Sequence, residues 1–112
     1  MFRRIVEDYE CRLVAVDAQL DANATGKAEH ERYGNGEVEL SVRVRGVPLA
    51  DGVRLEVHME IGDVGSIVLK NGRGELKIES RAGAIVPAVK AGDRILLTHD
   101  GKPLLAGVFA PD

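Results

Sequence analysis

The chain has 112 residues, a formal net charge of −3, a hydrophobic share of 45% and a charged share of 29%. This balance is typical of a folded globular protein, and the length predicts one domain spanning residues 1–112. Aromatic residues make up only 4%, and basic residues are spread among acidic ones along the sequence, which argues against a nucleic-acid partner. No apolar run approaches the roughly 20 residues of a membrane-spanning helix, so we expect no membrane span.

The first residues are ambiguous. Phe2, Ile5, Val6 and Tyr9 follow helical spacing, which allows one short helix at the N-terminus. The stretch lacks the apolar segment of a secretory signal. We therefore expect a cytoplasmic protein if this N-terminus is native, and an extracellular or periplasmic one if a leader was removed. The single Cys11 cannot form an internal disulfide, and we expect a small buried side chain, with a reactive or intermolecular thiol as the alternative.

Strands dominate the rest of the chain. In residues 37–45 and 53–61 every second residue is apolar, which predicts half-buried antiparallel strands with one face on a core. Weaker strand patterns occupy residues 14–20 and 26–33, and a clear one occupies residues 74–80.

Residues 93–98 and 103–109 are apolar on both faces, which predicts central strands. About eight strands at this spacing indicate an all-β fold. We predict an antiparallel β-sandwich, with a closed barrel as the second choice.

Three turns predict hairpins. Asn71-Gly72 is typical of a two-residue type I′ turn, which places Lys70 opposite Arg73. Asp100-Gly101 indicates a similar turn. The pairs expected beyond the first turn are Leu69 with Gly74, Ile67 with Leu76, and Gly65 with Ile78.

A longer loop is expected at Gly34-Asn35-Gly36. A two-residue turn at this point would conflict with the apolar pattern, whereas a three-residue loop agrees with it. The register of the longer loop opposes His30 to Leu40, Ala28 to Val42, and Gly26 to Val44.

Residues 36–57 and 74–98 share an ordered pattern of Gly-Glu, a strand, a connection containing Pro and Gly, and a second strand. One interpretation is a duplicated binding half. The other is that all-β chains reuse this arrangement. We favour the second, because no catalytic residue type recurs at matching positions.

The histidines are the first candidates for chemistry. His30 falls on the core-facing side of its predicted strand and is a candidate pocket residue, although a buried hydrogen-bonded side chain is the simpler interpretation. His58 lies on a polar face between Glu56 and Glu60, and His99 precedes a turn. No pair of histidines has metal-ligand spacing, and no serine has a nucleophile motif. We therefore assign no catalytic residue, no metal ligand and no cofactor.

Charged side chains suggest a contact surface. If residues 37–45 and 53–61 form neighbouring strands, arginines of the first strand face acidic residues of the second. A mixed-charge face of this kind suits a protein interface. The candidate interaction face comprises Arg43, Arg45, Arg54, Glu56, His58 and Glu60.

Four elements carry a resemblance: "ATGKAEHE" at residues 24–31, "NGEVELSVRVRGV" at residues 35–47, His58, and "GDVGSIVL" at residues 62–69. Together they resemble CHRD-type modules, small all-β domains of bacterial and animal extracellular proteins. In that family the strand is followed by a His-x-His element, of which only "VHM" is present here. The end of the chain, "VPAVKAGDRILLTHDGKPLLAGVF", resembles the end of uncharacterised bacterial β-domains. The resemblance implies a fold and not an activity.

We therefore predict a non-catalytic structural or protein-interaction module that associates with itself as a homo-oligomer. The alternative is a small metal- or ligand-binding domain, or an enzyme, in which His30 or His58 works with a carboxylate.

Overall fold

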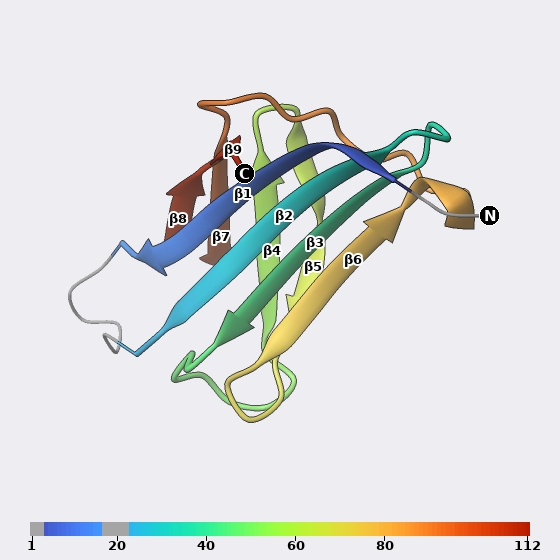
Figure 1. The fold of residues 1–112 in the computed structure, drawn as a ribbon. Coiled ribbons are helices and arrows are strands. Elements are labelled where there is room, and N and C mark those ends of the chain that lie inside the picture. The colour runs from blue at the N-terminus through green and yellow to red at the C-terminus, as the bar shows by residue number, and fades with distance from the viewer. Residues whose placement is uncertain (1–3, 17–22) are drawn as a thin grey trace.

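The computed structural model describes residues 4–16 and 23–112. This part of the chain is all-β, as predicted, and its strands form one antiparallel sheet in the order β5-β4-β7-β8-β1-β2-β3-β6, with β9 beside β1 (Figure 1). No helix among these residues is long and apolar enough to cross a membrane. The elements are β1 (Ile5–Ala15), β2 (Thr25–Tyr33), β3 (Val38–Arg45), β4 (Arg54–Met59), β5 (Gly62–Val68), β6 (Gly74–Glu79), the 3-10 turn η1 (Ser80–Ala82), β7 (Arg94–His99), β8 (Lys102–Val108) and β9 (Ala110–Pro111).

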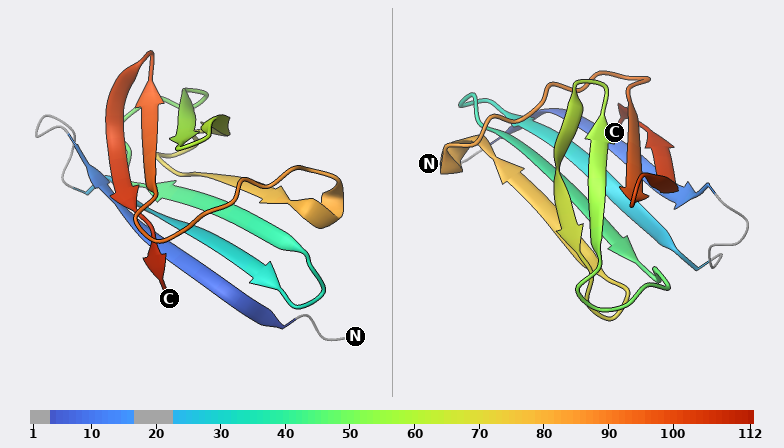
Figure 2. Two further views of the ribbon diagram at one scale, coloured as in Figure 1. Left: turned by 90° about the horizontal axis from the view of Figure 1, so that it is seen from above. Right: turned by 180° about the vertical axis from the view of Figure 1, so that it is seen from behind.

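The sheet folds into two layers. Strands β1, β2, β3 and β6 run side by side, and β5, β4, β7 and β8 form the second layer at a steep angle to them (Figures 1 and 2). The layers are continuous where β1 pairs with β8 through Val14 and Ala106. The end strands β5 and β6 of the order form no ladder with each other and are bridged only at their connecting turn, so the sheet is nearly closed into a barrel. The architecture is compatible with both a sandwich and a barrel.

The core lies between the layers and consists mainly of aliphatic side chains. Leu40 and Val42 of β3 and Leu55 and Val57 of β4 are fully buried, as their alternation predicts. Cys11 is buried with them as a free thiol, and burial raises its pKa to about 11. The strands β7 and β8 are central, which confirms the prediction from their two apolar faces.

The expected N-terminal helix is wrong, because residues 5–15 form strand β1. Leu13 of β1 is buried in the core, and its strand pairs with β2 along nearly its whole length. Ile5 and Val6, which contributed to the helical spacing, are 47% and 51% exposed and so carry no buried helical face. Phe2 lies outside the described residues, as does most of the strand expected at residues 14–20.

Two of the three hairpin predictions hold in full. The loop after β2 gives the predicted register, with His30 opposite Leu40. Asp100 and Gly101 have φ angles of 51° and 77°, and His99 pairs with Lys102 across them.

The third hairpin is confirmed only at its turn. Asn71 and Gly72 have φ angles of 55° and 73°, and Lys70 pairs with Arg73. The pairs expected beyond this bridge are wrong, because the two strands separate into opposite layers. Ile67 pairs with Leu55 of β4, and Leu76 pairs with Val42 of β3. Each of the two strands therefore directs its apolar side chains into the core from a different layer.

Candidate functional site

His30 lies on the inner face of β2, with 3% of its surface exposed. Its Nε2 is 2.9 Å from the carbonyl oxygen of Pro87, so Nε2 carries a proton and donates it. Nδ1 is buried and has no hydrogen-bond partner among the described residues. Burial lowers the pKa of His30, which favours the neutral ring. The side chain therefore fastens the connection between β6 and β7 to the core and is not aimed into an open pocket.

The predicted interaction face does not form as one surface. Strands β3 and β4 lie in different layers, so Arg43 and Arg45 do not face Glu56, His58 or Glu60. The expectation that these segments form neighbouring strands was wrong, because equal alternation in two segments says nothing about whether they are adjacent. An interaction role for the six residues stays a prediction. Arg54, Glu56, His58 and Glu60 belong to the layer of β4, whereas Arg43 and Arg45 belong to that of β3.

His58 links three strands. Its Nδ1 contacts Oδ1 of Asp63 on β5, and its Nε2 is 2.8 Å from Oγ1 of Thr98 on β7. In the neutral ring, with the proton on Nδ1 donated to the carboxylate, the Thr98 hydroxyl donates to Nε2. The order of carboxylate, imidazole and hydroxyl is that of a catalytic triad. Thr98 is only 5% exposed, however, so its hydroxyl is not presented to a substrate, and the three groups act as a clamp between strands.

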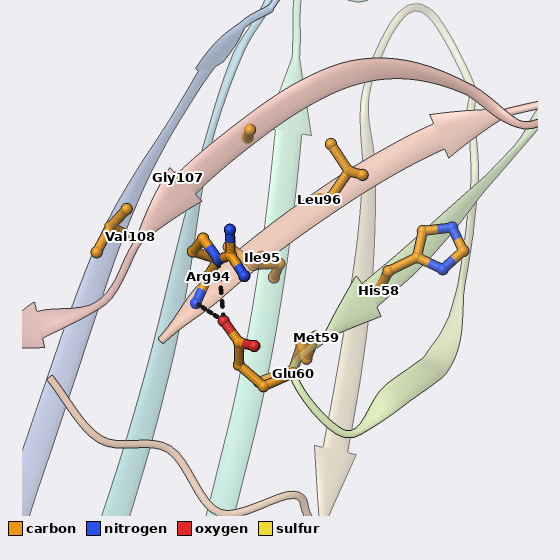
Figure 3. A pocket seen from close by; sticks show the side chains of 9 residues that line it. His58, Met59, Glu60, Arg94, Ile95, Leu96, Gly107 and Val108 are labelled. Carbon is orange, nitrogen blue, oxygen red and sulfur yellow. Dashed lines mark hydrogen bonds and ion pairs between the residues drawn. The ribbon is translucent and has the colours of Figure 1, made fainter. Parts of the chain in front are cut away.

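A shallow apolar groove of about 500 Å³ lies beside this clamp, across the ends of β4, β7 and β8 (Figure 3). Nε of Arg94 is 3.1 Å from Oε1 of Glu60, and this ion pair lies at one end of the groove. The hydrogen bonds from Arg94 lower the pKa of Glu60. Of the described residues that line the groove, none is a serine, threonine, cysteine or lysine, and the Nε2 of His58 is engaged by Thr98. Its lining residues are His58, Met59, Glu60, Arg94, Ile95, Leu96, Ala106, Gly107 and Val108.

A second groove, of about 910 Å³, is basic and lies on the outer face of β1, β2 and β3. The sheet register creates it, because Arg12 is opposite Lys27 and Lys27 is opposite Arg43. We call this surface the arginine groove. Its lining residues are Glu10, Cys11, Arg12, Thr25, Gly26, Lys27, Arg43, Val44, Arg45, Arg73, Val108 and Ala110.

The same outer face is acidic at its other end. Asp8, Glu31, Glu39 and Glu79 lie opposite one another in a row across β1, β2, β3 and β6. Burial raises the pKa of Asp8 to about 6, with further contributions from Glu31 and Asp112. Burial also raises the pKa of Glu31. The face is therefore divided into an acidic end and a basic end.

Sequence reasoning missed this division of charge. Along the chain, acidic and basic residues alternate with apolar ones and do not cluster. The clusters exist only across strands, and the register of β1 against β2 is set by the fold. One sequence feature could have indicated the division of charge. Along β1 the outward-facing residues are acidic at Asp8 and Glu10 and basic at Arg12.

No protein-family model matches the chain, and no curated protein matches it. The resemblance to CHRD-type modules therefore stays a prediction. Among residues 4–16 and 23–112, no group of three or more His, Cys, Asp or Glu side chains is placed to hold a metal ion. The fold and surface describe an all-β module with an open sheet edge and a charge-divided face.

Proposed function

We propose that the protein is a non-catalytic interaction module that associates with itself, two copies pairing along the free edge of β6. The observation that carries this proposal is the position of β6 at one end of the strand order, where β3 is its only ladder partner in the described chain. A free edge presents unpaired backbone N–H and C=O groups to a second strand. β6 has six residues, contains no proline and pairs with β3 without a bulge.

The other free edge, β5, is less suited to pairing. Gly62 and Gly65 have φ angles of 125° and 155°, and the register between β5 and β4 shifts at Val57 and His58. A bulge of this kind twists an edge strand away from a partner. The two edges therefore differ, and β6 is the regular one.

The charges on β6 favour one register of a twofold pair. Centring the pair on Leu76 places Glu75 of each copy opposite Lys77 of the other, and like charges are avoided. Centring it on Lys77 would place Lys77 opposite itself and Glu75 opposite Glu79, which destabilises a sheet. Centring it on Ile78 would pair only residues 77–79. A symmetric contact of the first kind is the commonest form of a homodimer.

The position of the histidines supports a non-catalytic role. His30 lies on β2 and His58 on β4, and these strands are not neighbours. His30 is bound to Pro87, and His58 is held between Asp63 and Thr98. His58 is paired with the carboxylate of Asp63 and lines a groove together with Glu60, as the alternative enzyme hypothesis requires. Both of its ring nitrogens are engaged within the clamp, however, so a role as general base would require the bond to Thr98 to break.

Sedimentation velocity and light scattering test the association. From about 1 µM to about 1 mM, the range of weak and moderate protein contacts, we expect the mass to rise from one copy to two. Amides of β6 are expected to become protected from hydrogen exchange at the high end of that range. A single copy at every concentration would contradict the proposal.

A matched pair of variants locates the contact. Lys77→Glu places glutamates opposite one another in the favoured register and is expected to weaken association by about tenfold, or about 1.4 kcal/mol. Lys102→Glu changes the charge equally on an exposed residue of β8 and is expected to leave association unchanged. Equal effects of the two variants would rule out the β6 edge.

A further inference from the structure

The arginine groove contains far more positive than negative charge, although the whole chain is negative. Five of its lining side chains are cationic and one, Glu10, is a carboxylate. The formal net charge of the chain is −3. The fold therefore concentrates positive charge in this groove, although the chain as a whole has a net negative charge.

Three of these cations have no counter-ion among the described residues. Lys27 contacts Glu10 at 2.5 Å and Glu29 at 3.0 Å, and Arg43 contacts Glu75 at 2.5 Å. By contrast, within the part of the chain that the structure describes, Arg12, Arg45 and Arg73 make no ion pair and no side-chain hydrogen bond. Like charges held together raise the free energy of the surface, and a bound anion lowers it.

The unpaired arginines come from three different strands or turns. Arg12 lies on β1, Arg45 on β3, and Arg73 beside the turn between β5 and β6. Each guanidinium offers planar pairs of N–H donors, which match the oxygens of phosphate and sulfate groups in a bidentate manner. The backbone of the sheet and the turn brings the three side chains to one groove, and binding an anion would order their exposed guanidinium groups.

The size and surroundings of the groove restrict the anion. A volume of about 910 Å³ exceeds the needs of one phosphate or sulfate group. Along β1 the acidic row begins at Asp8, four residues from Arg12, which is about 14 Å. A long polyanion following the strands would meet those carboxylates. No aromatic side chain is among the described residues that line the groove, so nucleic-acid bases have no stacking platform there.

We infer that the arginine groove binds a short polyanionic ligand carrying two or more phosphate or sulfate groups, held by Arg12, Arg45 and Arg73. This inference is independent of pairing along β6, because it needs only one copy of the chain. Inorganic tripolyphosphate serves as the phosphate probe, and a sulfated disaccharide as the sulfate probe.

Calorimetric titration of the wild-type chain at low salt tests the inference. We expect tripolyphosphate to bind more tightly than orthophosphate, because it engages several arginines at once. Raising the salt concentration is expected to weaken binding, since the site is open to solvent. The absence of binding by both the tripolyphosphate and the sulfated probe would overturn the inference. Whichever probe binds more tightly identifies the anionic group.

Alanine variants test whether the three arginines of the groove bind the anion. Arg12→Ala, Arg45→Ala and Arg73→Ala are each expected to weaken tripolyphosphate binding by about fivefold or more, since each removes a charge-assisted contact. Arg54→Ala is the matched control, because Arg54 is an exposed arginine on β4 in the other layer. It is expected to change binding less than twofold, about the effect of net charge alone. Equal losses in all four variants would indicate unspecific attraction and overturn the assignment.

A conservative variant separates bidentate binding from simple charge attraction. Arg45→Lys keeps the charge without the planar fork, so an intermediate loss of affinity is expected. Far-ultraviolet circular dichroism of every variant shows whether the sheet is retained, which distinguishes a lost contact from a lost fold. A single-stranded oligonucleotide that binds more tightly than tripolyphosphate would contradict a short ligand.

Discussion

The ring of His30 donates its Nε2 proton to the carbonyl oxygen of Pro87, 57 residues further along the chain and 2.9 Å away. The bond connects the inner face of β2 to the segment that leads from β6 to β7. That segment crosses one end of the two layers (Figure 1) and buries Val89 against the core. The bond therefore helps to hold a long connection that lies outside the strands of the sheet, together with the burial of Val89 and the hydrogen bond from Gly92 N–H to the Phe109 carbonyl oxygen.

The burial of the neutral His30 ring predicts a contribution to stability that is lost in acid. Burial holds the pKa of His30 below its ordinary value of 6.5, so the unfolded chain binds a proton more readily than the folded chain. The contribution of neutral His30 is complete above pH 6.5 and is lost as the pH falls through its lowered folded pKa. The stability that the wild type has over a variant without this histidine should therefore be larger at pH 7.5 than at pH 5 in urea unfolding. The opposite contribution of Asp8 is common to both proteins and cancels in this difference.

His30→Gln keeps a side-chain donor but does not titrate. At pH 7.5 its free energy of unfolding is expected to lie about 1–3 kcal/mol below that of the wild type through altered packing, and this difference should shrink at pH 5, where neutral His30 contributes less to the wild type. His99→Gln, which changes a histidine at the β7–β8 turn, is the control. If both variants retain the wild-type pH dependence, His30 is not its source.

The raised pKa of Asp8 predicts the opposite effect, a contribution to stability that is lost as the pH rises. Its pKa is raised from 3.8 to about 6, first by burial and then by Glu31 and Asp112. The folded chain therefore binds the proton more readily, so this contribution to stability is complete below about pH 3.8 and is lost as the pH rises through 6. Asp8→Asn removes the unfavourable carboxylate. We expect it to raise the free energy of unfolding at pH 7.5 by about 1 kcal/mol, allowing for solvent screening.

Chemical denaturation at two pH values checks this. The gain from Asp8→Asn should be present at pH 7.5 and nearly absent at pH 4, where the wild-type carboxyl is largely protonated. Asp100→Asn, at an exposed turn, should have no such pH-dependent effect. A destabilised Asp8→Asn variant at pH 7.5 would contradict the account of the acidic row.

The sequence predicted local relationships better than distant ones. The opposition of His30 to Leu40 followed from the apolar pattern and the short loop between their strands. The pairing of Ile67 with Leu76 failed, although the intervening turn was right, because a turn determines only the first pair after it. Packing against the two layers then decided where each strand continued.

The arginine groove, like the distant strand pairs, could not be predicted from local sequence patterns. Arg12 and Lys27 lie opposite one another, yet the segment joining their strands contains no turn motif from which the register could be read. Without that register, the basic residues are scattered along the chain. Predicting the groove from sequence would require knowing that β1 pairs with β2, whereas its N-terminal residues had suggested a helix.

At position 107, where the two layers join, the structure has space for glycine but not for a larger residue. A Cβ atom at this position would overlap Sγ of Cys11 and the carbonyl oxygen of Arg12. Because backbone atoms of β1 cannot move aside without disturbing their pairing, Gly107→Ala is expected to lower the free energy of unfolding by about 2–3 kcal/mol. Thermal and urea unfolding provide the measurement.

Gly34→Ala is the matched control for this effect. The nearest atom to a Cβ at Gly34 is Cγ1 of Val6 at 3.6 Å, an ordinary contact distance. Neither glycine requires a positive φ angle, so the two substitutions differ mainly in the space available. We expect Gly34→Ala to change stability by less than about 0.5 kcal/mol. Similar losses in both variants would mean that close approach of β8 to β1 is not what requires glycine at position 107.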